Sequence, residues 1–395
     1  MDCTLSEACS VRPKTAGALG INSIDFRLTE EQDAMQRWAR DFAENEIAPY
    51  ALEWDKNKEF PMETVKKMHQ MGLMTIGVPA KYGGEDYDNV TQNLITEEIA
   101  RGDAGIAITM VASTLLGANP VLVAATDKQK KWWYERELEG CITAFCFNES
   151  GAGSDGGDMF TRCHRVGDAY ILNGTKQFIS NGGIAGLYTV FAILDKKMGN
   201  RGMCAFMVDR NTPGISIGVR EDKRGNCSSN SVSINFENVR VPVQNLLGKE
   251  GDGFKIAVQT HNISQLNIAA ISLGVAEASF AAAAQYSFER YQFGKPIYES
   301  QPIQLMLSDM AEHIEAGRIL CLMTAIERHL GLSYRESASR AKCFCSDTAI
   351  KVTSEVAELF GGDRYFRKCP IEKYLRDANN MPIFEVQPKL LSPAI

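Results

Sequence analysis

The sequence predicts an α+β fold in three consecutive parts, which are helical, then β, then helical. Before about residue 140 and again after about residue 254, apolar residues recur at helical spacing. Between about 141 and 250 the apolar runs become short and are separated by Gly, Pro, Asn and Asp, which is typical of strands joined by turns. We expect a disordered arm at 1–23, a helical domain at 24–140, a β domain at 141–253 and a second helical domain at 254–395.

Helix start signals organise the first helical part. Thr29-Glu30-Glu31-Gln32 has the pattern of an N-terminal cap, and Phe60-Pro61 precedes a helix that should begin near Met62. Tyr82-Gly83-Gly84 interrupts the helical pattern, which resumes over 90–101. The pattern therefore predicts several helices rather than one long one.

The β part is expected to form a sandwich or a barrel, because its apolar runs are short and closely spaced. Asn173-Gly174 lies between two apolar runs and is interpreted as a hairpin turn. Gly248 to Gly253 should end the β part. The expected strands cover 143–147, 189–194, 203–208, 215–219 and 232–236.

Two apolar stripes identify the core faces of the C-terminal helices. Phe360-Gly361-Gly362 should end the second stripe as a C-cap. The first stripe consists of Ile303, Leu307, Met310, Ile314 and Cys321, and the second of Ala349, Val352, Val356 and Leu359.

Composition is typical of a globular enzyme, with 45% hydrophobic and 23% charged residues among 395. The net charge of −7 argues against binding to nucleic acid or to anionic membranes. We find no continuous apolar run of about 18 residues and no secretory signal, so no membrane span is expected. The 11 cysteines contain no C-x-x-C pair and the five histidines no ligand-spaced cluster, which predicts reduced thiols, a cytoplasmic location and no metal site.

A glycine-rich segment follows the first predicted strand. Gly151 to Gly156 matches G-x-G-x-x-G, but that nicotinamide fingerprint requires a long helix directly after it. Polar residues, an apolar run and Asn173-Gly174 follow instead, so the Rossmann interpretation fails. A glycine loop within β structure still lets backbone N–H groups approach a ligand closely.

Several motifs occur together in an order that resembles the acyl-CoA dehydrogenase family, closest to its medium- and short-chain members. The resemblance covers roughly residues 24 to 385. A lone glycine loop would be weak, but so many pieces in family order form a specific signal. The motifs are Val78-Pro79 with Tyr82-Gly83-Gly84, Thr96-Glu97-Glu98-Ile99-Ala100, Glu149-Ser150-Gly151-Ala152-Gly153-Ser154-Asp155, Asn173-Gly174 with Lys176, Phe178-Ile179-Ser180-Asn181-Gly182-Gly183, 236–242, Glu289-Arg290-Tyr291-Gln292-Phe293-Gly294-Lys295, Phe360-Gly361-Gly362 and Leu375-Arg376-Asp377-Ala378.

This resemblance implies a central β-barrel, a C-terminal four-helix bundle, FAD as cofactor and a tetramer built as a dimer of dimers. In the family, segments matching 290–293 and 358–362 reach the FAD of a neighbouring subunit. The implied substrate contacts are Ser154, Asn262 and Gln265. The implied FAD contacts are Phe145, Cys146, Phe147, Asn148, Gly153, Ser154, Phe178, Ile179, Ser180, Arg290, Gln292, Phe293, Gln301, Glu358, Gly361 and Gly362.

The family chemistry needs a base for the α-proton of a thioester and stabilisation of the enolate that forms. Glu385 matches the family's base. The second family location of the base, around Ser264, holds Ser264, Gln265 and Asn267 here, so Glu385 is the carboxylate at either place. The β-hydride is then taken up by the flavin.

Four departures from the family pattern carry information. After Glu385, Pro388 disfavours the usual helix, and a terminal helix is expected to be missing or very short. Gln265 stands where an Arg is common, and Glu358 replaces a Gln near the FAD diphosphate. Phe178 and Ser180 replace Trp and Thr, a mild change.

Two explanations remain open, either a need for a related partner subunit to complete each flavin site or a tail remodelled for an unusual acyl thioester. The leading interpretation is an FAD-dependent dehydrogenase of acyl-CoA or another acyl thioester, or an enoyl-CoA reductase in reverse. An electron-transferring flavoprotein is its expected partner, in a homotetramer or a heteromer. The alternatives are a non-catalytic or half-site subunit of a heteromeric acyl-CoA dehydrogenase, and a flavin oxidase or monooxygenase on the same fold.

Overall fold

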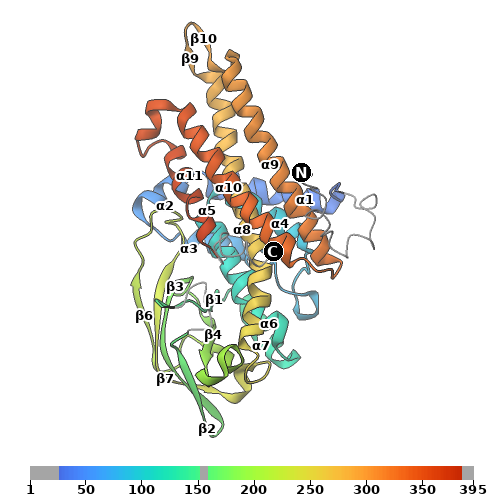
Figure 1. Ribbon diagram of the computed structural model, residues 1–395, viewed down its shortest axis with the longest axis vertical. Coiled ribbons are helices and arrows are strands. Elements are labelled where there is room, and N and C mark those ends of the chain that lie inside the picture. Colours follow the sequence, from blue (N-terminus) through green and yellow to red (C-terminus); the bar gives the residue numbers. More distant parts are fainter. Residues whose placement is uncertain (1–25, 152–158, 385–395) are drawn as a thin grey trace, which may run out of the picture.

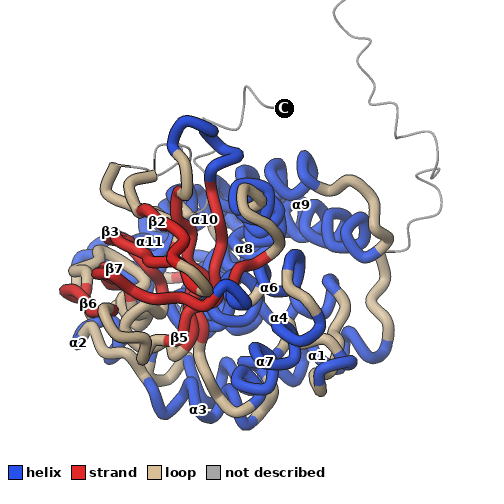
Figure 2. Tube along the Cα trace, turned by 90° about the horizontal axis from the view of Figure 1, so that it is seen from below, coloured by secondary structure: helices blue, strands red, loops and turns tan. Residues whose placement is uncertain are grey.

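The computed structural model describes residues 26–151 and 159–384, and it confirms the three-part fold (Figure 1). A helical layer, a β-sheet and a second helical layer follow one another along the chain. In Figure 2 the strands gather on one side, and the helices of both helical parts surround and extend from them.

The first helix begins where the sequence predicts, whereas the expected arm at 1–23 lies outside the described residues. Thr29 caps α1 in a capping box. The Thr29 hydroxyl accepts from the Gln32 backbone N–H, and the Gln32 side-chain oxygen accepts from the Thr29 backbone N–H. Asp103 caps α5 by a single bond, in which its carboxylate accepts from Ile106 N. The helices are α1 (Glu30–Phe42), α2 (Ala51–Asn57), α3 (Met62–Gln70), α4 (Asn89–Gly102), α5 (Ala104–Val111), α6 (Asn119–Ala124) and α7 (Asp127–Leu138), with π-helical turns at Ala43–Ile47 and Ala112–Gly117.

One eight-stranded mixed sheet forms the middle part. Its order is β6-β7-β3-β2-β4-β5-β8, and β1 lies parallel to β4. Strands β4 and β5 are buried nearly throughout, because helices and the other strands cover them. The strands are β1 (Thr143–Cys146), β2 (Arg162–Val166), β3 (Ala169–Ser180), β4 (Leu187–Ile193), β5 (Met203–Asp209), β6 (Ile215–Arg220), β7 (Ser231–Pro242) and β8 (Leu246–Leu247).

The hairpin prediction at Asn173-Gly174 is wrong. Strand β3 continues through both residues, and its pairing with β7 shifts register between Leu172 and Gly174. Gly174 has φ +151°, and a Cβ there would lie 2.5 Å from the Thr161 hydroxyl. Asn-Gly therefore marks a bulge within a long strand, while the turn between β2 and β3 lies at Gly167.

Three long helices form the C-terminal part, and α8 extends from the sheet to the β9–β10 hairpin at the top of Figure 1. Met310, Ile314 and Cys321 of the first predicted stripe are buried, as are Ala349, Val352 and Val356 of the second. The elements are α8 (Gly253–Glu289), β9 (Tyr291–Gln292), β10 (Lys295–Pro296), α9 (Gln301–His329), α10 (Arg335–Leu359) and α11 (Pro370–Ala378), with a 3-10 turn at Met381–Ile383.

Two helical stretches, Ala104–Ala124 and Gly253–Glu289, are long and apolar enough by composition to cross a membrane, which the search for continuous apolar runs did not predict. In the fold their apolar windows are 83% and 78% buried. Their apolar character is accounted for by packing inside the protein, since central helices that are covered on all sides have no polar face.

Candidate functional site

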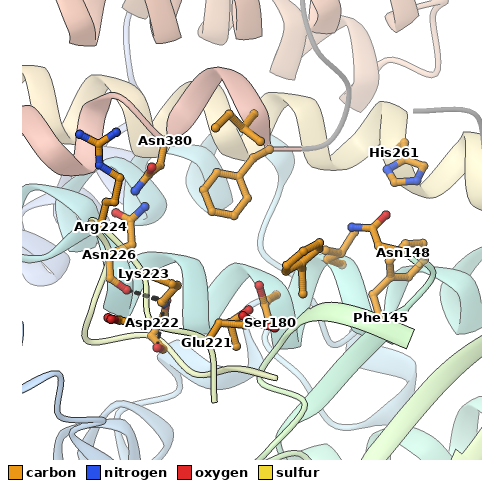
Figure 3. Close-up of a pocket in the computed structure, with 18 residues that line it drawn as sticks. Phe145, Asn148, Ser180, Glu221, Asp222, Lys223, Arg224, Asn226, His261 and Asn380 are labelled. Atoms are coloured by element: carbon orange, nitrogen blue, oxygen red, sulfur yellow. Dashed lines mark hydrogen bonds between the residues drawn. The ribbon is translucent and has the colours of Figure 1, made fainter. Parts of the chain in front are cut away.

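A cavity of about 450 Å³ lies between the sheet and the helices (Figure 3). We call it the central cavity. Most of its wall surface is apolar, although eleven of its 18 lining residues are polar or charged. Apolar walls with polar groups placed among them are the usual character of a cofactor or small-molecule site. Its lining residues are Ala112, Leu116, Phe145, Asn148, Phe178, Ser180, Glu221, Asp222, Lys223, Arg224, Gly225, Asn226, Ser229, Ser231, His261, Asn380, Ile383 and Phe384.

One end of the central cavity is an aromatic cluster. Phe145 lies on β1, and its ring centroid is 5.1 Å from that of Phe191 on β4. His261 of α8 meets Phe145 and Phe147 edge-on, at 5.4 and 5.3 Å. This packing fixes the direction of the Phe145 ring at the cavity wall. Asn148 follows β1 and brings a polar side chain to the same end.

Phe178 stands out on the sheet side of the central cavity. It has φ +57°, an uncommon conformation for a bulky residue, and its side chain is 58% exposed. The pairing of β3 with β7 shifts register between Lys176 and Ile179, which turns Phe178 toward the cavity and Ile179 into the core. A strained position of this kind indicates a functional constraint.

A charged loop between β6 and β7 forms the opposite end of the cavity. Lys223 lines the cavity and donates to the Asn226 and Ser229 carbonyls at 2.7 and 2.9 Å. Burial lowers the pKa of Lys223 to about 8. The loop therefore places the Lys223 amine at this end of the cavity, where two carbonyl groups of the same loop accept hydrogen bonds from it.

The segment after α11 closes the cavity from the helical side. Asn380, Ile383 and Phe384 all line it. The predicted base Glu385 follows Phe384 directly, and it lies outside the described residues, as do Gly153 and Ser154.

A second cavity, of about 590 Å³, lies beside the β9–β10 hairpin, and we call it the hairpin cavity. Phe293 has φ +53° and is fully exposed, and Gly361, with φ +56°, follows α10 as predicted for a C-cap. Two cations and two acids line this cavity, Arg290 and Lys295 with Glu358 and Asp363. The six predicted FAD contacts that meet here are Arg290, Gln292, Phe293, Glu358, Gly361 and Gly362.

Other predicted site residues do not line either cavity. The side chains of Cys146, Phe147 and Ile179 belong to the packed core. Gln301 begins α9, adjacent to Ser300 of the hairpin cavity. Asn262 is half-buried on α8, and Gln265 is buried there with its Oε1 atom lacking a hydrogen-bond partner within the described chain.

Sequence reasoning missed the Glu221 to Asn226 loop, His261, Asn380 and Ile383 as cavity residues. A dense run of charges interrupted by Gly225 was the available signal for the loop, and His261 carries no sequence signal at all. The charged run has the appearance of an ordinary surface turn.

Comparison with known protein families matches most of the described chain. The N-terminal, middle and C-terminal domain models of acyl-CoA dehydrogenase match residues 29–140, 144–239 and 251–385. An acyl-CoA dehydrogenase of Bacillus subtilis is 41% identical over 361 residues, which is 91% of this chain and 95% of that protein.

Two solved structures show the same fold at high similarity. Butyryl-CoA dehydrogenase from Megasphaera elsdenii superposes with a TM-score of 0.91 at 38% identity, covering 94% of this chain and 98% of that one. A chain from the structural study of the electron transferring flavoprotein of Acidaminococcus fermentans has a TM-score of 0.92 at 40% identity, with the same coverage.

Proposed function

Because this chain belongs to the acyl-CoA dehydrogenase family, and is thus an FAD-dependent oxidoreductase that acts on acyl-CoA, we propose that it oxidises short-chain acyl-CoA with Glu385 as the base. Relatives named for short-chain or butyryl substrates support the chain length. The observation that carries the proposal is that Phe384, directly before Glu385, lines the central cavity together with Phe178 and Phe145.

The described residues fit FAD. The central cavity offers the flat aromatic and apolar walls that a flavin ring requires, from Phe145, Phe178 and Phe384. The hairpin cavity offers Arg290 and Lys295, the residue types that bind phosphate oxygens, beside two glycines whose missing Cβ atoms leave open space. We propose that the two cavities hold different parts of FAD and that a neighbouring subunit completes each site.

The roles of the chain's own residues follow from this placement. Glu385 removes the α-proton of the thioester, while Phe384 and Ile383 keep water from that end of the cavity. Asn148 and Ser180 supply hydrogen-bonding groups to a bound flavin ring. FAD, when bound, accepts the β-hydride.

Partner assignments extend the proposal. An electron-transferring flavoprotein is the proposed acceptor, supported by the similarity to a chain studied with such a flavoprotein. A homotetramer is the proposed assembly. One observation supports the heteromeric alternative: the Glu358 carboxylate lines the hairpin cavity, where it would repel a bound diphosphate.

Purified protein reconstituted with FAD tests the proposal directly. A panel of acyl-CoAs of increasing chain length is mixed with it under anaerobic conditions, and bleaching of the visible absorbance of the flavin is followed. We expect rapid bleaching by short-chain thioesters. A protein that binds FAD stably and is not bleached by any thioester contradicts the proposed activity.

A further inference from the structure

Arg376 and Asp377, consecutive residues of α11, hold the two peptide groups that flank Gly225. The Arg376 guanidinium donates to the Arg224 carbonyl at 2.7 Å, and the Asp377 carboxylate accepts from the Asn226 N–H at 2.5 Å. One helix turn thus contacts the loop at the charged end of the central cavity through a donor and an acceptor.

Gly225 shows how close this contact is. A Cβ at this residue would lie 2.6 Å from the Arg376 carbonyl and 2.8 Å from the Asn380 amide. Since Arg376 and Asn380 flank the end of α11, the loop backbone lies directly against that end. Only glycine fits there without a shift of the loop.

Buried charges anchor the contact on its far side. Lys373 lies 2.6 Å from Asp377 and 2.8 Å from Asp103, the N-cap of α5, and all three are buried. Ser228, in the same loop region, donates its hydroxyl to Asp103. Arg376 also pairs with Asp55 of α2 at 2.5 Å. The position of α11 is therefore set against three other elements, and breaking one partner of a buried pair leaves an uncompensated charge.

The same helix leads into the segment that contains the proposed base. Asn380, Ile383 and Phe384 line the central cavity, as do Arg224, Gly225 and Asn226. Asp377 therefore connects two walls of one cavity. Its hydrogen bond to Asn226 reaches the charged loop, and the chain that follows it forms the wall with Asn380 and Phe384. Any displacement of Asp377 changes the separation of these walls.

We propose that Asp377 is a positioning residue, which through its bond to Asn226 sets the distance between the charged loop and the segment that leads to Glu385. The inference rests on the proposed function for the role of Glu385, but the loop contact itself is independent of it. Misplacement of reacting groups by about 1 Å can lower a rate by about 100-fold.

Asp377→Asn tests this, because the carboxylate accepts from both Lys373 and the Asn226 N–H, whereas an amide of the same size offers one oxygen, for which the Lys373 cation competes with Asn226. Glu98→Gln is the control, since Glu98 is equally buried and binds Arg40 and Gln36 between α1 and α4, outside both cavities. With butyryl-CoA, we expect the bleaching rate per bound flavin to fall about tenfold or more in Asp377→Asn with little change in KM. The control should retain the parent rate.

Amide hydrogen exchange provides a readout that does not depend on turnover. Exchange of 221–231 and of 379–384 should accelerate in Asp377→Asn and stay at the parent level in Glu98→Gln. If the parent protein is bleached by no thioester, the proposed function fails and this exchange measurement alone decides the inference. Parent-level exchange in Asp377→Asn overturns it.

Gly225→Ala is the second variant and serves if Asp377→Asn does not fold. It keeps every charged side chain and moves the loop away from α11 by the bulk of one methyl group. We expect the same loss of bleaching rate at unchanged KM, and a double variant no worse than the more impaired single one, since both act on one contact. Additive losses, or a parent rate in Gly225→Ala, contradict the proposal.

Discussion

Lys176 and Glu149, which lies just before the glycine-rich loop, form an ion pair at 2.8 Å in which both side chains are buried. Lys176 also donates to the Phe147 carbonyl at 3.0 Å, and Glu149 accepts from Phe160 N and Thr161 N at 2.5 and 3.0 Å. The two side chains therefore join the strand before the loop to the strand after it.

Lys176→Met should destabilise the protein by about 3–5 kcal/mol, because it leaves the Glu149 carboxylate buried without its cation. Urea unfolding at pH 7 measures the change. Lys66→Met is the control, since Lys66 pairs with exposed Glu63 on the surface and should cost about 1 kcal/mol or less. Equal changes in the free energy of unfolding in the two variants would show that the buried pair stabilises the protein no more than the surface pair.

The same pair predicts a loss of stability in acid. Burial alone raises the pKa of Glu149, but the charge and hydrogen bond of Lys176, with hydrogen bonds from Thr161 and Phe160, lower it below the ordinary 4.5. A carboxylate whose pKa is lower in the folded state contributes stability above pH 4.5 that is lost as the pH falls through the folded-state value. The free energy of unfolding should therefore decrease below pH 4.5 less steeply in Glu149→Gln than in the parent.

Glu137→Leu should stabilise the protein by about 1–3 kcal/mol at pH 7. Glu137 is buried on α7, and within the described chain neither carboxylate oxygen makes a well-formed hydrogen bond, although Trp133 weakly favours its charged form. Burial raises its pKa well above 4.5, so the folded parent binds the extra proton and loses stability as the pH rises above 4.5. Thermal unfolding over a pH series checks both points, and an unchanged pH slope in Glu137→Leu would contradict them.

Glu385→Gln should lower kcat by about 100- to 10,000-fold, the usual contribution of a positioned base. FAD should stay bound, because the substitution leaves the residues of both cavities in place. Visible absorbance reports the bound flavin, and stopped-flow mixing with acyl-CoA reports the chemical step. Turnover at the parent rate would show that another group removes the proton.

Arg290→Ala should weaken FAD binding by about 1.5–3 kcal/mol, the cost of losing a hydrogen bond to a charged group. Glu358→Gln should strengthen it by about 1–2 kcal/mol, since a carboxylate beside a diphosphate is repulsive. Both residues line the hairpin cavity. Equilibrium titration of the apoprotein with FAD measures the changes, and tighter binding in Arg290→Ala would place the diphosphate elsewhere. If Glu358→Gln alone confers binding on an otherwise colourless protein, the heteromeric alternative gains support.

The order of elements was determined by the sequence itself, because local signals specify it. The Thr29 cap, the helix start at Met62 and the apolar stripes of α9 and α10 depend on residues a few positions apart. The six predicted FAD contacts that line the hairpin cavity also come from one short hairpin and one helix end, so their motifs are close together in the sequence.

Only the tertiary structure decided how distant segments share one cavity. Asn173-Gly174 became a bulge because β7 pairs along the whole of β3, and that partner lies far away in sequence. The register shift before Ile179 decided that Phe178 lines the cavity. Cys146 faces away from the cavity that its neighbour Phe145 lines, and the elements packed around β1 bury it. The contact of Asp377 with Asn226 joins residues 151 positions apart, and no local propensity can encode a contact over that separation.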